Sequence, residues 1–91
     1  MEFETCGDVT DAAEFLKVLG NPVRLRIVAF LGTGESNVKY IWEYLDLPQA
    51  TVSQHLVLLK DKGIIGGVRD GVKVRYSVIH PLARKILEVI G

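Results

Sequence analysis

The stretch from Leu47 to Ile65, LPQATVSQHLVLLKDKGII, constrains the fold of this chain more than any other. Its apolar residues recur at intervals of three and four positions, which is the spacing of one face of an α-helix. The residues of this apolar face are Val52, Leu56 and Leu59. Pro48 suits the first helical turn, because the backbone N–H that proline lacks would have no partner there. We therefore expect one amphipathic helix that packs against a core and stops near Gly63.

The other face of this helix is polar, and its N-terminal half has amides and hydroxyls without charge. The residues of this polar face are Gln49, Ser53, Gln54, Lys60 and Asp61. Short amide and hydroxyl side chains fit the edges of base pairs in the major groove of DNA. The same pattern also describes an ordinary surface helix, so this stretch alone leaves both interpretations open.

Composition indicates one globular domain over residues 1–91, with a flexible lead over residues 1–9. Apolar residues make up 48% of the chain and charged residues 24%, which is typical of globular proteins. So high an apolar content in a small domain favours a buried dimer interface. A single cysteine, Cys6, excludes an intrachain disulfide. Because no apolar run reaches membrane-spanning length and no signal-peptide pattern is present, we expect a cytoplasmic protein with no membrane partner.

Charge is balanced overall but not along the chain. Positions 1–48 hold eight acidic and four basic residues, whereas positions 49–91 hold three acidic and seven basic residues. The half that contains the amphipathic helix is therefore the basic one, which favours an anionic partner for that half. The formal net charge of +0 gives no such support for the chain as a whole.

Periodicity and capping residues predict three shorter helices before this stretch, over residues 10–19, 23–31 and 37–45. Thr10 or Asp11 is expected to cap the first helix, and Ser36 or Asn37 is expected to begin the third. The second helix is expected to turn four residues toward the core: Leu25, Val28, Ala29 and Phe30.

The third and fourth predicted helices are joined by only three residues, Asp46-Leu47-Pro48. Two helices joined by so short a turn, the second with a polar tip, form the helix-turn-helix arrangement. The turn of this motif usually carries a glycine, so Asp46 or Leu47 must adopt the conformation that glycine would take.

The chain after Gly63 has the pattern of a β-hairpin. Apolar and polar residues alternate from Val72 to Val78, and Asp70-Gly71 before them predicts a type I′ turn. The polar face of this hairpin is expected to carry three cations, Arg69, Lys73 and Arg75. A basic hairpin directly after a DNA-reading helix is a wing that lies along phosphates or in the minor groove. A solvated β-ribbon is the alternative, and the order of the elements favours the wing.

Residues 81–90 predict a final helix that is apolar around most of its circumference. Such a helix needs a second surface to bury, and the first helix offers further apolar residues. We expect these two helices to form a homodimer interface through Phe15, Leu16, Leu19, Leu82, Ile86, Leu87 and Ile90. The alternative is that the last helix simply crosses the core of one domain.

Three stretches together resemble the ArsR/SmtB family of small prokaryotic winged-helix repressors. They are residues 19–28, residues 47–65 with VSQHL at 52–56, and residues 69–77. The resemblance implies a mainly α (α+β) winged helix-turn-helix, with about five helices and a two-stranded β-hairpin wing. It also implies a homodimer that binds double-stranded DNA at an imperfect inverted repeat and represses transcription until an inducer releases it.

The resemblance assigns roles to individual residues. Base readout falls on Gln49, Ala50, Ser53 and Gln54, with the methyl group of Thr51 available to a thymine methyl. Phosphate or minor-groove contacts fall on Lys39, Tyr40, Arg69, Lys73 and Arg75. His55 either touches phosphate or is a satisfied structural histidine, and the two roles stay open.

The metal sites of the family are not matched in this chain. The first signature is a Cys-x-Cys in the third helix, but Asn37 and Lys39 stand at the matching positions. The second uses an aspartate of the last helix, where this chain has His80. Zinc or nickel needs about four to six N, O or S donors, so we predict no metal and no cofactor. Cys6 is either an oxidisable thiol or a free thiol without a role.

The leading hypothesis is a homodimeric, metal-independent, sequence-specific transcriptional repressor. The alternative is a winged-helix protein–protein interaction module without DNA binding, which the zero net charge supports. An enzyme is the weakest hypothesis, because the sequence has no nucleophile–base pair, no phosphate-binding glycine loop and no paired carboxylates at a useful spacing.

Overall fold

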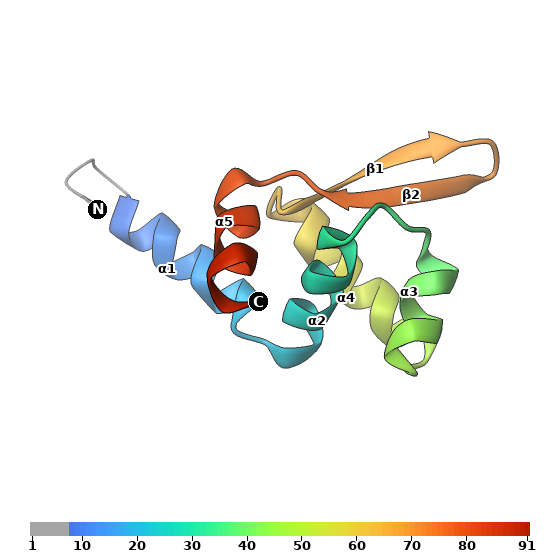
Figure 1. The fold of residues 1–91 in the computed structure, drawn as a ribbon, viewed down its shortest axis with the longest axis horizontal. Helices are drawn as coiled ribbons and strands as arrows, with labels where there is room; N and C mark the ends of the chain where they lie inside the picture. Colours follow the sequence, from blue (N-terminus) through green and yellow to red (C-terminus); the bar gives the residue numbers. More distant parts are fainter. Residues whose placement is uncertain (1–7) are drawn as a thin grey trace.

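The structure, a computed structural model, describes residues 8–91 as five helices and one β-hairpin (Figure 1). The elements are α1 (Asp8–Leu19), α2 (Pro22–Gly32), α3 (Val38–Leu45), α4 (Gln49–Asp61), β1 (Ile65–Asp70), β2 (Lys73–Val78) and α5 (Pro81–Ile90). This order confirms the predicted mainly α fold with a helix-turn-helix and a two-stranded wing.

The start of the chain differs from the prediction. Residues 1–7, and Cys6 with them, lie outside the described residues, whereas Val9, which was expected in a flexible lead, belongs to α1. Because α1 begins earlier than predicted, Thr10 and Asp11 lie within the helix and neither of them caps it.

An asparagine caps the N-terminus of α2 and of α3, because the first N–H groups of a helix need acceptors from outside it. The Oδ1 atom of Asn21 accepts hydrogen bonds from the backbone N–H groups of Val23 (2.9 Å) and Arg24 (3.1 Å). The Oδ1 atom of Asn37 accepts one from the N–H of Tyr40 (3.1 Å). The cap of α3 places the N-terminus of this helix beside the wing.

Helix α4 begins later than the helix expected in the stretch 47–65, and it ends close to Gly63 as predicted. Pro48 is its N-cap residue, with φ −59° and ψ 143°, and does not lie in the first helical turn. After the end of α4, Gly63 adopts a φ of 72°. Glycine takes this left-handed conformation without steric cost, so the chain leaves the helix there and enters β1.

The core collects one apolar face from each element. The buried apolar residues are Val18, Leu19, Ile27, Val28, Leu31, Ile41, Leu45, Val52, Leu56, Leu59, Ile64, Ile65, Val78 and Ala83. The predicted apolar face of α4 is confirmed, since its three residues are at most 4% exposed. The inner face of α2 was partly wrong, because Ile27 and Leu31 are buried while Ala29 is exposed. Helix α2 contacts four other helices and β2, so its neighbours and not its own weak periodicity determine which side is buried.

Asp46 makes the turn of the helix-turn-helix, with φ 58° and ψ 48°. Among the non-glycine residues that the structure describes, it alone has a positive φ. Aspartate tolerates this region better than most residues, because its short polar side chain can bond locally. The backbone N–H of Leu47 donates to the carbonyl oxygen of Trp42 (3.2 Å), which closes the turn. Asp46, and not Leu47, therefore replaces the usual glycine.

The two wing strands pair antiparallel, and their register ends with Asp70 opposite Lys73. The turn residues are thus Gly71 and Val72, one position later than predicted. Val72 lies at the tip with 93% of its surface exposed, and does not belong to the strand. Gly71 has a positive φ (68°) and Val72 does not, which excludes type I′. Glycine at the first central position is the type II′ arrangement.

The loop between α2 and α3 adds an unpredicted contact to the outer edge of β2. The N–H of Ser36 donates to the carbonyl oxygen of Tyr76 (3.0 Å), and the N–H of Tyr76 donates to that of Ser36 (2.7 Å). A two-stranded hairpin is marginally stable by itself, so this bridge helps to hold the wing against the start of α3.

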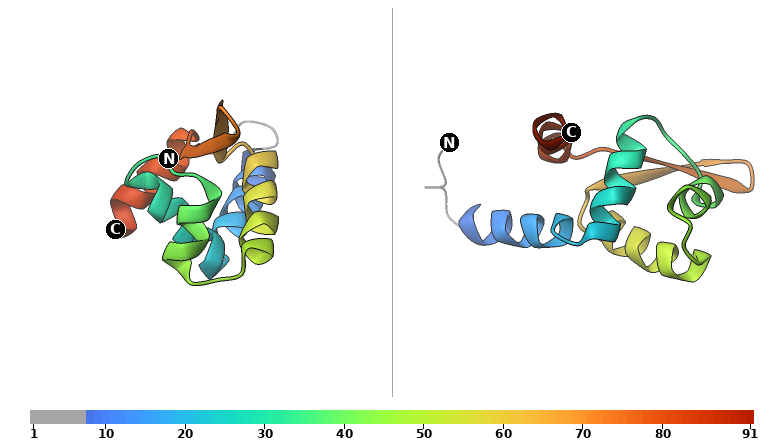
Figure 2. Two further views of the ribbon diagram at one scale, coloured as in Figure 1. Left: turned by 90° about the vertical axis from the view of Figure 1, so that its right-hand side faces the viewer. Right: turned by 60° about the horizontal axis from the view of Figure 1, so that its bottom comes forward.

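The elements spread along one long axis (Figure 1). Helices α1 and α5 lie toward one end, and α1 extends away from the rest of the fold in the right-hand view of Figure 2. Helix α3 and the tip of the wing lie at the other end, with α2 between. None of the helices in residues 8–91 is long and apolar enough to cross a membrane.

Candidate nucleic-acid interface

The N-terminal half of α4 presents the predicted polar tip to solvent. Its residues are exposed or half-buried: Gln49, Ala50, Thr51, Ser53, Gln54 and His55. Within residues 8–91, none of these side chains has a hydrogen-bond partner. Their donors and acceptors are therefore available to a ligand, while Val52 and Leu56 anchor the same helix in the core.

A groove of about 310 Å³, here called the α3–wing groove, lies between the N-terminus of α3 and the wing. Its walls are Asn37, Val38, Lys39, Tyr40, Val72, Lys73, Val74 and Tyr76. The structure thus brings together Lys39, Tyr40 and Lys73, three predicted DNA contacts from distant parts of the sequence. The two lysines are exposed and the helix N-terminus adds partial positive charge, so the groove suits an anion such as phosphate.

The cations of the wing lie on two faces and not on one. Arg69 is opposite Val74 in the register, and residues that oppose each other in an antiparallel pair share a face. Lys73 and Arg75 flank Val74 in β2 and therefore lie on the other face. The prediction of a single polar face was wrong for Arg69. Any two-residue turn pairs odd-numbered residues of β1 with even-numbered residues of β2, which separates Arg69 from the other two cations.

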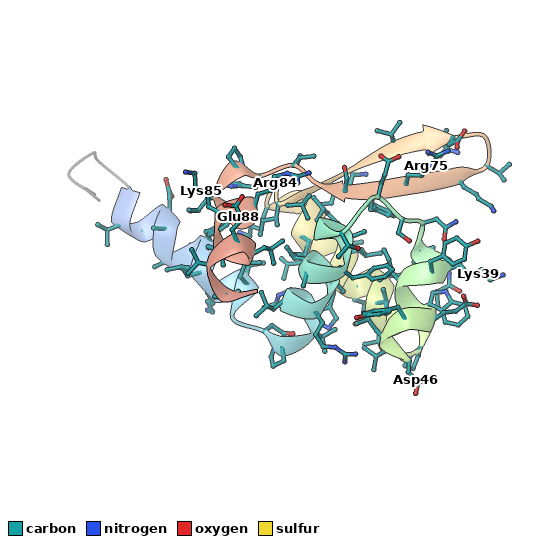
Figure 3. The ribbon with its side chains drawn as sticks, viewed as in Figure 1. Lys39, Asp46, Arg75, Arg84, Lys85 and Glu88 are labelled. Atoms are coloured by element: carbon teal, nitrogen blue, oxygen red, sulfur yellow. The ribbon has the colours of Figure 1, made fainter. Side chains whose placement is uncertain are left out.

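Arg75, which Figure 3 shows in the wing, is held by two carboxylates. Its Nη1 atom lies 3.1 Å from Oε1 of Glu35, in the loop before α3, and its Nη2 atom donates to Oδ2 of Asp70, at the end of β1. The hydrogen bond to Glu35, followed in size of effect by the hydrogen bond to Asp70, raises the pKa of Arg75 above its usual value. The three side chains are 52–57% exposed, so this is a surface cluster.

Some cations of the basic half lie far from this end of the molecule. Figure 3 shows Arg84 and Lys85 on α5, well away from Lys39. The Nη2 atom of Arg84 donates to the carbonyl oxygen of Val78 (2.7 Å), which ties α5 to the end of β2. The charge asymmetry along the chain therefore overstates how much positive charge surrounds α4 and the wing.

Glu35 and Asp70 were not predicted as partners of Arg75. Asp70 was interpreted only as a turn residue, although its alternation with Arg69 places it on the same face as Arg75. Glu35 is 40 positions from Arg75 in the sequence, and no local pattern indicates that the two side chains meet.

Metal-ligand candidates are scattered in the described part of the chain. No three His, Cys, Asp or Glu side chains gather there. His80, at the position of a family metal ligand, has a structural role: its Nδ1 atom accepts a hydrogen bond from the N–H of Leu82 (3.2 Å) at the start of α5. Its ring centroid also lies 4.6 Å from that of Phe15, which connects α5 to α1.

A family model described as "Bacterial regulatory protein, arsR family" matches residues 21–66, from the cap of α2 into β1. The chain belongs to the arsR family. The matched region of this arsR protein includes the whole helix-turn-helix and the polar tip of α4. The match confirms the predicted family, whose model describes a bacterial regulatory protein.

Two relatives of this arsR protein are named as repressors. The HTH-type transcriptional repressor SmtB of Mycobacterium tuberculosis is 39% identical over 86 residues, which are 92% of this chain and 64% of the relative. The chain thus spans slightly less than two thirds of the length of SmtB. The transcriptional repressor PagR of Bacillus anthracis is 38% identical over 82 residues, which are 89% of this chain and 82% of PagR.

Solved structures confirm the winged helix-turn-helix of this arsR protein. The crystal structure of PagR matches with a TM-score of 0.84 and 37% identity, over 91% of this chain and 95% of that one. Reduced HlyU from Vibrio cholerae matches with a TM-score of 0.87 and 26% identity, over 91% of this chain and 87% of that one.

Proposed function

We propose that this arsR-family protein is a sequence-specific DNA-binding transcriptional repressor that acts as a homodimer. The observation that carries the proposal is the uncharged polar tip of α4, which follows directly from α3 and its lysine-lined groove. DNA recognition needs polar side chains for base edges beside cations for the backbone, and this end of the molecule offers both. The names of SmtB and PagR as transcriptional repressors support the same function.

We assign base recognition to the tip of α4. The amides of Gln49 and Gln54 can each donate and accept a hydrogen bond, which matches the major-groove edge of adenine. Ala50 and the methyl group of Thr51 suit the methyl group of thymine, and the hydroxyl of Ser53 suits several base edges.

We assign the backbone contacts to the α3–wing groove and its surroundings. Lys39, Tyr40 and Lys73 would hold a phosphate in the groove, and Arg69 would reach the DNA from the opposite face of the wing. His55 is half-buried at the edge of the apolar face of α4, so contact with phosphate and a structural role stay open for it.

The homodimer part of the proposal rests on apolar side chains that α1 and α5 leave in solvent. Leu16 is 56% exposed, Ile90 59% and Val89, which was not predicted, 84%. The half-buried members of the predicted interface are Phe15, Leu82, Ile86 and Leu87. Because α1 also extends from the fold, a second copy would cover this surface and remove it from water.

Two observations refine this interface. Leu19 is only 5% exposed, so it packs in the core of its own protomer and has little surface left for a partner. A hollow of about 570 Å³ between α2 and α5 includes Leu87 and Ile90 in its walls, and it extends the apolar surface of this end.

A two-fold dimer would present two α4 tips, so the target would be an imperfect inverted repeat with its half-sites in successive major grooves. We infer a repressor that works in the cytoplasm, where it would find its DNA. It would need no metal and no cofactor for binding, since Asn37 and Lys39 occupy the positions of the thiolates in the metal-sensing signature.

Selection from a pool of random-sequence duplexes tests this function. The full chain should enrich sites with two-fold symmetry, and the Gln49→Ala/Gln54→Ala variant should enrich none while keeping its helical content. Failure of the wild type to enrich any sequence, or enrichment of sites without symmetry, would contradict the proposal.

The zero net charge favours one other candidate function, a winged-helix module that binds a protein. Salt distinguishes the two, because displaced counterions make DNA binding weaken steeply as salt rises. An apolar protein contact should change little over the same range.

A further inference from the structure

Three residues, named here the Arg75 cluster, join the wing to the loop before α3: Arg75, Glu35 and Asp70. Both terminal nitrogens of the guanidinium are used, Nη1 by Glu35 at 3.1 Å and Nη2 by Asp70. The cluster carries two negative charges and one positive charge. The charge of Arg75 is therefore already compensated by carboxylates, unlike the charge of an exposed lysine that has no anion beside it.

We propose that Arg75 is a positioning residue that stays bound to Glu35 and Asp70 when DNA binds, fixes the wing against α3, and does not neutralise a phosphate. This replaces the expectation that Arg75 contacts the DNA backbone. The statement about the DNA complex rests on the proposed function, whereas the statement about the wing concerns the free protein as well.

The local charge argues against a phosphate contact by Arg75. A phosphate that replaced the two carboxylates would leave both of them unpaired beside a polyanion, so the exchange gains little attraction. Within the described chain, Lys39 and Lys73 have no ion-pair partner and can neutralise a phosphate without this cost. The charge distribution therefore separates Arg75, which anchors the wing, from Lys39 and Lys73, which are free to bind a phosphate.

The position of the cluster argues for a structural task. Glu35 directly precedes Ser36, and Arg75 directly precedes Tyr76, so the ion pair lies next to the two backbone hydrogen bonds that bridge Ser36 and Tyr76. The next residue after this bridge, Asn37, caps α3 and lines the α3–wing groove. By stabilising the Ser36–Tyr76 bridge, the ion pair would keep the two lysines of the groove at a fixed separation.

The salt dependence of DNA binding tests the proposal. Fluorescence anisotropy would measure affinity at several salt concentrations, with a labelled duplex that carries the selected site and another of scrambled sequence. Lys73→Ala should lower the salt slope by about one, the effect expected for one lost phosphate contact. Arg75→Ala should weaken binding and leave the slope at its wild-type value. A drop with Arg75→Ala equal to that with Lys73→Ala would overturn the proposal.

Neutralising the carboxylates provides the reciprocal test. Glu35→Gln/Asp70→Asn frees Arg75, so the slope should rise by about one and binding to the scrambled duplex should become several-fold tighter. Adding Arg75→Ala to that variant should abolish the rise. If the rise persists without the arginine, the carboxylates act only by repelling DNA, and the proposal is wrong.

Hydrogen exchange on the free protein separates this proposal from the proposed function. The amide hydrogens of Ser36 and Tyr76 should lose protection in Arg75→Ala, while those of the α4 core turn around Leu56 keep theirs. Unchanged protection at the bridge would refute the positioning role, whatever the DNA measurements give. If the wild type binds no duplex but the bridge still opens in Arg75→Ala, the proposed function fails and the positioning role stands.

Discussion

The two ends of this molecule expose side chains of different chemistry. At the α1/α5 end large apolar side chains are exposed among the charged ones, with Leu16 at 56% and Val89 at 84%. At the other end the tip of α4 exposes amides and the α3–wing groove exposes lysines. Apolar surface is best covered permanently by protein, because its exposure to water is unfavourable at any salt concentration. Cations and unpaired amides fit a charged partner that salt can release. Exposure alone therefore does not identify a site. The chemistry of the exposed side chains indicates which kind of partner covers them.

The largest expected effect comes from placing a charge at the apolar end. Ile90→Glu should convert the dimer to monomer, because a carboxylate in the interface would lose its hydration. Each DNA-binding tip would then bind alone, and affinity for a two-fold site should fall by about 100-fold or more. Sedimentation and anisotropy would measure the two effects. Val57→Glu is the control for the sedimentation measurement, since Val57 is 59% exposed on α4 and a carboxylate there should leave the dimer intact.

A smaller effect is expected at the polar end. Gln54→Ala removes an exposed amide from the tip of α4 and should cost about 1–3 kcal/mol of discrimination between the selected and the scrambled duplex. The dimer and the unfolding midpoint should stay unchanged, because Gln54 is exposed and does not belong to the core. A Gln54→Ala protein that discriminates like the wild type would remove the tip of α4 from the recognition surface.

The turn that positions this tip offers a still smaller effect. Asp46→Val should lower the free energy of unfolding by about 1–2 kcal/mol, because a β-branched residue is strained at φ 58°. Asp46→Gly is the control and should be neutral or stabilising, since glycine adopts this conformation freely. Urea unfolding would measure both. Equal losses in the two variants would mean that the carboxylate of Asp46, and not the backbone conformation, is what matters.

The sequence predicted the structure correctly where interactions between residues close in the chain determine it. The spacing of Val52, Leu56 and Leu59 predicted the buried face of α4, and the range of α5 was correct at both ends. These features depend on helical periodicity and on a proline at the first position, which act within a few residues. The order of such elements also predicted a wing directly after the helix-turn-helix, which the structure confirms.

Sequence failed where distant segments decide the structure. The meeting of Glu35 with Arg75 and the bridge between Ser36 and Tyr76 join segments 40 positions apart, and no periodicity encodes such pairs. The dipeptide Asp70-Gly71 indicated a hairpin but not which residues turn, because only the pairing of the strands places Gly71 and Val72 at the tip. A residue-type argument could therefore find the cations of the wing but not their partners.

The smallest expected effect distinguishes one lysine at each end. Lys39 lines the α3–wing groove, whereas Lys85 lies on α5 at the other end (Figure 3). Lys39→Ala should weaken binding to selected and scrambled duplexes by the same few-fold factor and reduce the salt slope by about one. Lys85→Ala should change neither quantity, because it lies beyond the reach of a duplex held at the groove and screening weakens its long-range attraction. Equal effects of the two substitutions in the anisotropy titrations would show that binding depends on overall charge. The chemical difference between the two ends would then not determine where DNA binds.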